Sequence, residues 1–259
     1  MKKKIWLTSL EGAQDAVQHI MASLKKYGLE IDGHFWEDDL EKMAWCKPRG
    51  ELVDENVKMW IIYGSAESLV KKSVRYGLSM LALTTQAQKG IAFPIVVVQA
   101  GTPPVTADTL PERFSNCVVY QGEPSGYGAK IVAALHKPVA KVTLPYRIDV
   151  YGIPQIGQWF EVGPVGKDWQ GVIFATEGET IKMHAVGNSG QLPEKSVLNY
   201  AQQGLKIDMG EVSFDGWAVQ NVLDADTSYF VKVEGAPKAV MFCPYSQEDE
   251  AEAYVIRLS

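Results

Sequence analysis

The strongest constraint on the fold of this chain is a change of hydrophobic pattern near its middle. Over residues 1–137, apolar runs of strand length alternate with segments whose apolar residues recur every three or four positions. The first pattern is typical of a buried strand and the second of an amphipathic helix. Repeated β-α order predicts a parallel sheet covered by helices on both faces. We therefore expect residues 1–137 to form an α/β domain of the doubly wound, Rossmann-like type.

The second half of the chain, residues 138–259, has a different pattern. Short strand-like runs are separated by Gly, Pro, Asn and Asp at intervals of about ten residues, which predicts a β-rich domain, either a sandwich or a barrel. One segment, "PEKSVLNYAQQG", has Pro193 where a first helical turn favours it and Gly204 as a terminator, so it predicts one helix. The boundary has an alternative, because residues 138–154 also suit a further strand of the parallel sheet.

Charge is distributed unevenly along the chain, whose net charge is −6. Residues 1–137 contain 16 Lys and Arg against 15 Asp and Glu, whereas residues 138–259 contain 9 against 16. An acidic half disfavours nucleic acid as a partner, because Lys and Arg supply most of the affinity for a phosphate backbone.

The apolar segments and the cysteines indicate where such a chain works. No apolar run approaches the roughly 18 residues that a membrane-spanning helix needs. The basic start "MKKKIWLTSL" is interrupted at Thr8 and Ser9, unlike the apolar centre of a secretion signal. The three cysteines are far apart and odd in number, which suits a reducing compartment. We expect a cytoplasmic protein with neither nucleic acid nor a membrane as its partner.

A glycine-containing loop gives the first candidate for a ligand site. In "VVYQGEPSGYGAKIVAAL" a strand, this loop and a helical pattern follow one another. Loops at the carboxyl ends of parallel strands open into the crevice where doubly wound domains bind ligands, and a helix N-terminus suits an anion. The loop after the first strand should lie at the same edge of the sheet. The expected ligand-binding residues are Thr8, Ser9, Gly12, Gly122, Ser125, Gly126 and Gly128.

An alternative accounts for the same residues without a ligand. "GEPSGYGAK" has the spacing of neither the Walker A motif nor G-x-G-x-x-G. On this interpretation Gly122 and Gly126 turn the chain, and Gly128 lets the helix pack closely on the sheet. Thr8 and Ser9 then act as helix caps.

Charged side chains supply two further candidates, each with an ordinary alternative. One acidic group suits a hard cation or a ribose hydroxyl, and equally a solvated loop: Glu37, Asp38, Asp39 and Glu41. One basic group suits phosphate or an acidic partner, and equally the outer face of a helix: Lys71, Lys72 and Arg75.

Familiar catalytic and metal-binding motifs do not occur in this sequence. It contains no C-x-x-C, H-E-x-x-H or G-x-S-x-G. The four histidines stand apart from one another at His19, His34, His136 and His184. We expect no metal site.

Two segments of the first half resemble the TIR-like domains of flavodoxin-like architecture. "KIWLTSLEGAQDAVQHIMASLKKYGLEID" is similar to the opening strand, Ser-containing loop, acidic residue (Asp15) and helix of that family, with Gly28 at the entry to strand two. "MWIIYGSAESLVKKSVRYGLSMLAL" followed by "AFPIVVV" resembles its central strand, Ser-rich helix start and next strand. The resemblance covers about the first 135 residues and implies a flavodoxin-like sheet.

The resemblance also sets the expected function. Members that cleave NAD carry a glutamate in a Trp-Cys-x-x-Glu context, and that place falls here at Arg75 or Tyr76. Glu67 comes too early to match it and is the one weak candidate for a catalytic residue. We therefore expect a non-catalytic sensor or interaction protein that binds a small anionic ligand, with a nucleotide as the first candidate for its unknown cofactor. The alternatives are an assembly module that binds a protein partner or a second copy, and a nucleotide- or NAD-hydrolysing enzyme.

Overall fold

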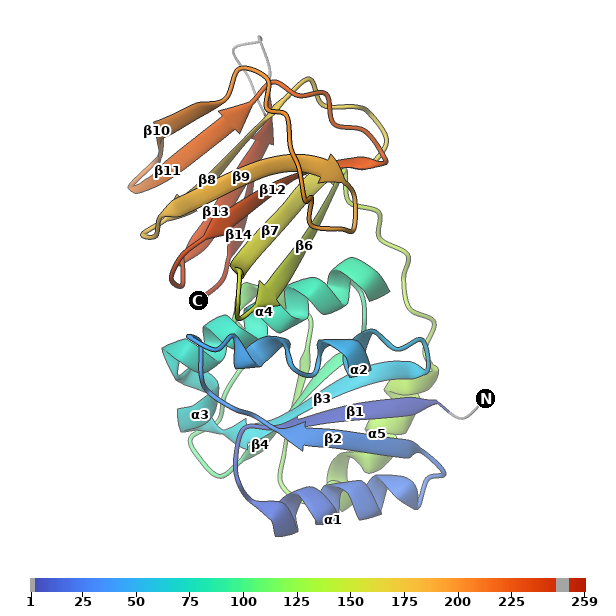
Figure 1. Ribbon diagram of the computed structural model, residues 1–259. Helices are drawn as coiled ribbons and strands as arrows, with labels where there is room; N and C mark the ends of the chain where they lie inside the picture. The colour runs from blue at the N-terminus through green and yellow to red at the C-terminus, as the bar shows by residue number, and fades with distance from the viewer. Residues whose placement is uncertain (1–2, 246–251) are drawn as a thin grey trace. The chain divides into compact units, whose positions relative to one another are not determined.

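The computed structural model describes residues 3–245 and 252–259, and the chain divides into two compact units, Met1–Val142 and Thr143–Ser259 (Figure 1). The expected division lay between residues 137 and 138. Residues 138–154 add no strand to the first unit, because β6 (Tyr146–Ile153) pairs antiparallel with β7 (Gly157–Pro164) of the second. No helix in the described ranges is long and apolar enough to cross a membrane.

The first unit is built on a five-stranded parallel sheet in the order β2-β1-β3-β4-β5. The strands are β1 (Lys4–Ser9), β2 (Glu30–Phe35), β3 (Val57–Ser65), β4 (Ile95–Ala100) and β5 (Val118–Gln121). This strand order is that of flavodoxin-like folds, in which the order of adding strands reverses between β1 and β3. The flavodoxin-like sheet expected from the sequence is confirmed.

Helices cover both faces of this sheet (Figure 1). The α-helices are α1 (Gln14–Lys25), α2 (Arg49–Val53), α3 (Ala66–Val70), α4 (Lys72–Lys89) and α5 (Pro124–His136). Single 3-10 turns lie at η1 (Ala44–Cys46), η2 (Ala107–Thr109) and η3 (Glu112–Phe114). Figure 1 shows α1 and α5 on one face of the sheet and α2 and α4 on the other.

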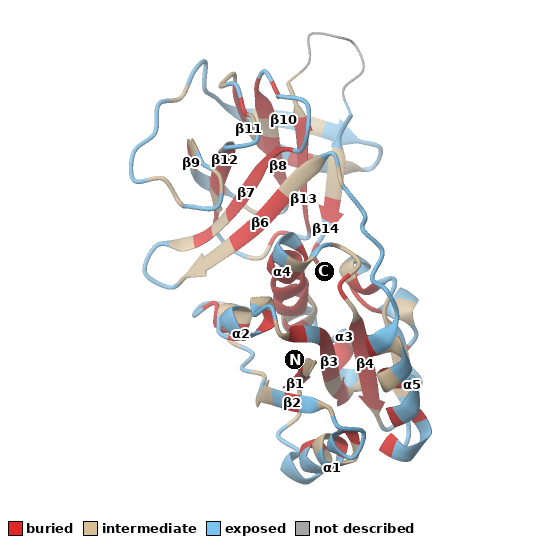
Figure 2. Ribbon diagram, turned by 90° about the vertical axis from the view of Figure 1, so that its right-hand side faces the viewer, coloured by how far each residue is buried: buried red, intermediate tan, exposed pale blue. Residues whose placement is uncertain are grey.

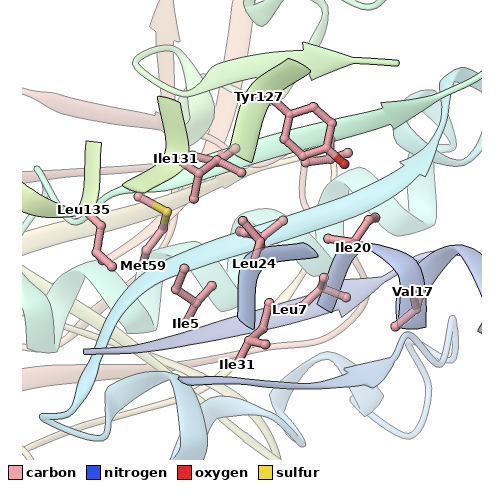
Figure 3. Packing of buried hydrophobic residues seen from close by; sticks show 13 residues of the cluster. Ile5, Leu7, Val17, Ile20, Leu24, Ile31, Met59, Tyr127, Ile131 and Leu135 are labelled. Carbon is pink, nitrogen blue, oxygen red and sulfur yellow. The ribbon is translucent and has the colours of Figure 1, made fainter. Parts of the chain in front are cut away.

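One core fills the space between the sheet and the pair α1/α5 (Figure 3). Apolar side chains of the inner strands meet those that recur at helical spacing on α1 and α5. Burying each such Leu or Ile side chain stabilises the fold by about 1.5–3 kcal/mol. The central members are Ile5, Leu7, Met59, Ile61, Ile20, Leu24, Ile131 and Leu135.

The second unit is a sandwich of two antiparallel sheets, in the orders β10-β11-β8-β13-β14 and β6-β7-β12-β9. Its other strands are β8 (Val172–Glu177), β9 (Ile181–Asn188), β10 (Gln202–Met209), β11 (Val212–Val219), β12 (Thr227–Val233), β13 (Ala239–Pro244) and β14 (Tyr254–Arg257). Phe160 of one sheet and Phe174 of the other are both fully buried, with ring centroids 5.6 Å apart. Figure 2 shows buried residues along β3, β4 and α4 of the first unit and along β6 and β7 of the second. The β-rich domain is thus a sandwich.

The prediction of a helix over residues 193–204 is wrong. This segment lacks helical structure, and β10 begins inside it at Gln202. The side chain of Asn221 accepts a hydrogen bond from the Asn199 N–H (2.8 Å) and donates one to the Val197 carbonyl (2.9 Å). These bonds replace the bonds that a helix would make within itself, so tertiary contacts override the local helical pattern.

A buried carboxylate ties the sheet β6-β7-β12-β9 to its neighbouring loop. Glu161 on β7 is 3% exposed, and its oxygens accept hydrogen bonds from Ser228 Oγ (2.7 Å), Gly190 N (2.9 Å) and Ser189 Oγ (3.1 Å). The Tyr151 hydroxyl also donates to it. A buried carboxylate with this many donors is stabilised only while all of them remain in place.

We expect Glu161→Gln to destabilise the β-sandwich by about 3 kcal/mol. The NH₂ group of the glutamine would face the N–H and O–H donors that now bond to the carboxylate. Native-state hydrogen exchange of the β7 amides in the full chain measures this loss. Glu234→Gln is the matched control, since Glu234 forms an exposed ion pair with Lys182. Equal β7 protection in the wild type and Glu161→Gln contradicts the prediction.

His34 on β2 is partly buried, and β2 pairs with β1 at this position. The indole N–H of Trp6 donates to Nδ1 of His34 across 3.1 Å, and their ring centroids are 5.8 Å apart. Nε2 of His34 is buried without a hydrogen-bond partner among the described residues. Burial lowers the pKa of His34 from 6.5 to about 4. The ring is therefore neutral at pH 7, with Nδ1 as the acceptor.

Acid should destabilise the α/β unit through His34. The unfolded imidazole takes up a proton near pH 6.5, whereas the folded one resists protonation until about pH 4. The contribution of His34 to stability is complete above pH 6.5 and is lost as the pH falls toward 4, by at most about 3 kcal/mol. Hydrogen exchange of the β1 amides measures the loss, which His34→Gln should lack and His136→Gln should retain. A His34 ring that titrates near pH 6.5 by NMR would overturn this assignment.

Candidate functional site

A pocket of about 250 Å³ lies in the α/β unit at the carboxyl ends of β3, β4 and β5. Its walls come from α1, from these strand ends and from the start of α5. The carboxyl edge is where a doubly wound sheet leaves space for a ligand, because the loops there diverge to helices on opposite faces. Ala16, Ile20 and Pro124 give the pocket an apolar side.

Two tyrosines give the pocket its hydroxyl groups. Tyr127, on the first turns of α5, is 2% exposed, and its ring stacks on Tyr120 with centroids 5.6 Å apart. Tyr63 lines the same pocket from β3 and is half-buried. Within the described residues, neither hydroxyl makes a hydrogen bond. Burial raises the pKa of both hydroxyls, so at neutral pH each is a protonated donor.

The first turn of α5 borders the pocket with its backbone. Gly122 turns the chain with φ +82°, Glu123 is the N-cap residue and Pro124 begins the helix. No side chain caps the helix, so the positive end of its dipole is not compensated there. At the rim, Nδ1 of His19 and a carboxylate oxygen of Glu123 are 3.7 Å apart, and both side chains are exposed. The acidic group at the rim therefore lies in solvent.

A buried amide holds the wall that follows β4. Gln99 is 2% exposed, and its Oε1 accepts hydrogen bonds from Val105 N (2.7 Å) and Gln121 Nε2 (2.6 Å). Its Nε2 donates to the Pro103 carbonyl (2.5 Å). Through these bonds one side chain positions the loop that supplies Gly101 to the pocket.

Of the seven residues expected to bind a ligand, only Gly122 lines this pocket. Thr8 is fully buried, and its hydroxyl oxygen accepts a hydrogen bond from the Trp60 indole (2.8 Å). The Ser9 hydroxyl donates to the Glu11 carbonyl (2.7 Å), and Gly12 is exposed. Strands β3 and β4 separate β1 from β5, so the two loops are not neighbours in the sheet.

The other three expected residues lie in a helix and not in a loop, because α5 begins at Pro124. Ser125 is exposed, and a Cβ on Gly126 would have no atom within 4 Å. A Cβ on Gly128 would lie 2.9 Å from Tyr27 Cε2. Gly128 is therefore closely packed, but against Tyr27, just after α1, and not against the sheet.

Two glutamates, one after β1 and one in α3, have different surroundings. Glu11 Oε1 accepts hydrogen bonds from Ser65 N (2.9 Å) and Ser68 Oγ (2.7 Å), and bonds from Ser65 and Ser68 lower its pKa. The Ser65 side chain also caps α3 by accepting from Ser68 N (3.1 Å). Glu67, the weak catalytic candidate, is exposed on α3 and does not line the pocket.

The acidic group that suited a cation is occupied by basic side chains. Asp38 pairs with Lys71 (2.8 Å), Asp39 pairs with Lys42 (2.7 Å), and Glu37 pairs with Lys47. Over the described ranges, no group of three or more His, Cys, Asp or Glu side chains could hold a metal ion.

Comparison with protein families and with curated proteins finds no match for this chain. Among solved structures, a response regulator protein from Burkholderia multivorans covers 54% of this chain and 100% of its own, at 16% identity and a TM-score of 0.35. A two-domain esterase (CEX) active on acetylated mannans covers 99% of this chain and 90% of its own, at 7% identity and a TM-score of 0.33. The same esterase with mannopentaose gives 7% identity and a TM-score of 0.32. We therefore assign the fold from the strand order of the chain itself.

Gln99→Leu should loosen the wall of the pocket, because the buried Val105 N–H then has no acceptor. An unsatisfied buried N–H costs about 1–3 kcal/mol, so the Val105 amide should exchange about tenfold faster or more in the full chain. Gln121→Leu is the control. Gln121 is exposed, and its replacement removes its own hydrogen bond to Gln99 while the bond between Gln99 and Val105 remains. Unchanged protection of Val105 in Gln99→Leu would show that Gln99 does not hold this loop.

Proposed function

We propose that the α/β unit binds a small anionic molecule, with a nucleotide as the first candidate, in the pocket between α1 and α5. The observation that carries the proposal is the meeting of this pocket with the uncapped N-terminus of α5 at the carboxyl edge of the sheet. The positive end of a helix dipole favours negative charge at such a place. The apolar side formed by Ala16, Ile20 and Pro124 suits the ring of a base or a similar planar group.

The polar groups of the pocket suit binding without chemistry. They are two hydroxyls, the N-terminal end of α5 and one exposed His–Glu pair. Glu67 lies outside the pocket lining, so we assign it no catalytic role. The protein would act as a sensor or carrier of its ligand. None of the three cysteines, all within the described ranges, forms a disulfide, which supports a cytoplasmic location.

Filling the pocket should remove ligand binding. A thermal-shift series with NAD, FMN, ATP, AMP and inorganic phosphate should identify a ligand, since a compound at a hundred times its Kd adds about 2.7 kcal/mol of stability. Ala16→Trp places an indole in the pocket, and we expect it to abolish the shift. Ala22→Trp puts the same side chain on an exposed position of α1 and should leave the shift intact.

The proposal has two ways to fail. Binding that survives Ala16→Trp unchanged would move the site elsewhere. Absence of any shift in the wild type at millimolar concentrations would remove an anionic ligand of this class.

A further inference from the structure

The hydroxyl of Tyr127, on a side chain that is otherwise buried, is the most informative group in the pocket. Tyr127 is 2% exposed, yet its hydroxyl makes no hydrogen bond within the described residues. In Figure 3 its oxygen points away from Ile131 and Leu135, the core residues of the same helix. Because Tyr127 lines the pocket, its hydroxyl can donate a hydrogen bond to a molecule bound there.

A second hydroxyl faces the same space. Tyr63 lines the pocket from the end of β3, and its hydroxyl also makes no hydrogen bond within the described part of the chain. The pKa of Tyr127 is raised by burial and then by the nearby Tyr63 and Glu123. Two protonated phenols that share one pocket each offer a donor, so one acceptor can bond with both.

The start of α5 favours an acceptor that carries negative charge. The helix has 13 residues, and no side chain caps its N-terminus. The carboxylate nearest to it, Glu123, is 77% exposed and pairs with His19 at the rim. An anion inside the pocket thus meets O–H donors and the positive end of the α5 dipole, while solvent screens the charge of the exposed Glu123 side chain.

We propose that the hydroxyls of Tyr127 and Tyr63, with the first turn of α5, bind an oxyanion of the ligand, either a phosphate monoester or a carboxylate. This inference rests on the function proposed above and names the group that the pocket recognises. The remainder of the ligand lies on the apolar side formed by Ala16, Ile20 and Pro124. Tyr127 is then the residue that decides which ligands bind.

The test compares matched probes on the full chain by NMR titration. AMP and adenosine differ only by the phosphate, while inorganic phosphate and acetate separate the two kinds of oxyanion. We expect AMP to bind at least tenfold more tightly than adenosine. Tyr127→Phe should weaken AMP binding by about tenfold, the value of one hydrogen bond to a charged group, and should leave adenosine unchanged. Tyr120→Phe is the matched control, because Tyr120 stacks on Tyr127 but does not line the pocket.

The outcomes separate this inference from the function on which it rests. Stronger perturbation of Tyr127 by phosphate than by acetate supports a phosphate ligand, and the reverse supports a carboxylate ligand. If adenosine binds as tightly as AMP, and Ala16→Trp but not Tyr127→Phe removes binding, the pocket binds a neutral ligand and the oxyanion inference is overturned. If no probe binds the wild type, the proposed function fails and the inference fails with it.

Discussion

The α/β unit depends on the burial of β3 on both faces. Met59 and Ile61 belong to the core beneath α1 and α5, while Trp60, between them in sequence, points to the opposite face and is also fully buried. The Trp60 indole donates to Thr8 of the neighbouring strand, which links the pairing of β1 and β3 to the packing of one large side chain. A slip of one residue would exchange the two faces, so this contact defines the register. That register places Tyr63 at the carboxyl edge of the sheet, where the pocket forms.

Much of the fold could be predicted because buried parallel strands and amphipathic helices leave distinct patterns in a sequence. The parallel sheet of the first unit and the β-sandwich of the second follow from those patterns. The predicted helix at residues 193–204 failed because the Asn221 side chain, distant in sequence, takes the backbone groups that a helix would use. Local propensity is a weak guide wherever tertiary hydrogen bonds of this kind are available.

The candidate site was harder to predict, because polar residues near strand ends have more than one use. Thr8 and Ser9 resemble ligand-binding residues in the sequence, but their hydroxyls satisfy groups within the fold. Tyr63 and Tyr127 resemble ordinary core aromatics in the sequence, and only the folded chain shows that both line one pocket. The buried Glu161 of the β-sandwich offers a contrast, since four donors surround its carboxylate. Its surroundings indicate a structural group, whereas no hydrogen bond within the described residues gives the pocket hydroxyls such a role.

The stacking of Tyr120 on Tyr127 has a consequence for how a ligand would be recognised. A phenol ring packed against a second ring, on a helix whose next turns are buried in the core, has little freedom to change its rotamer. Its hydroxyl therefore occupies nearly the same position before and after binding, and little conformational entropy is lost when a ligand arrives. Such a site would discriminate among ligands by the fit of one atom and would respond quickly, since no segment needs to rearrange first.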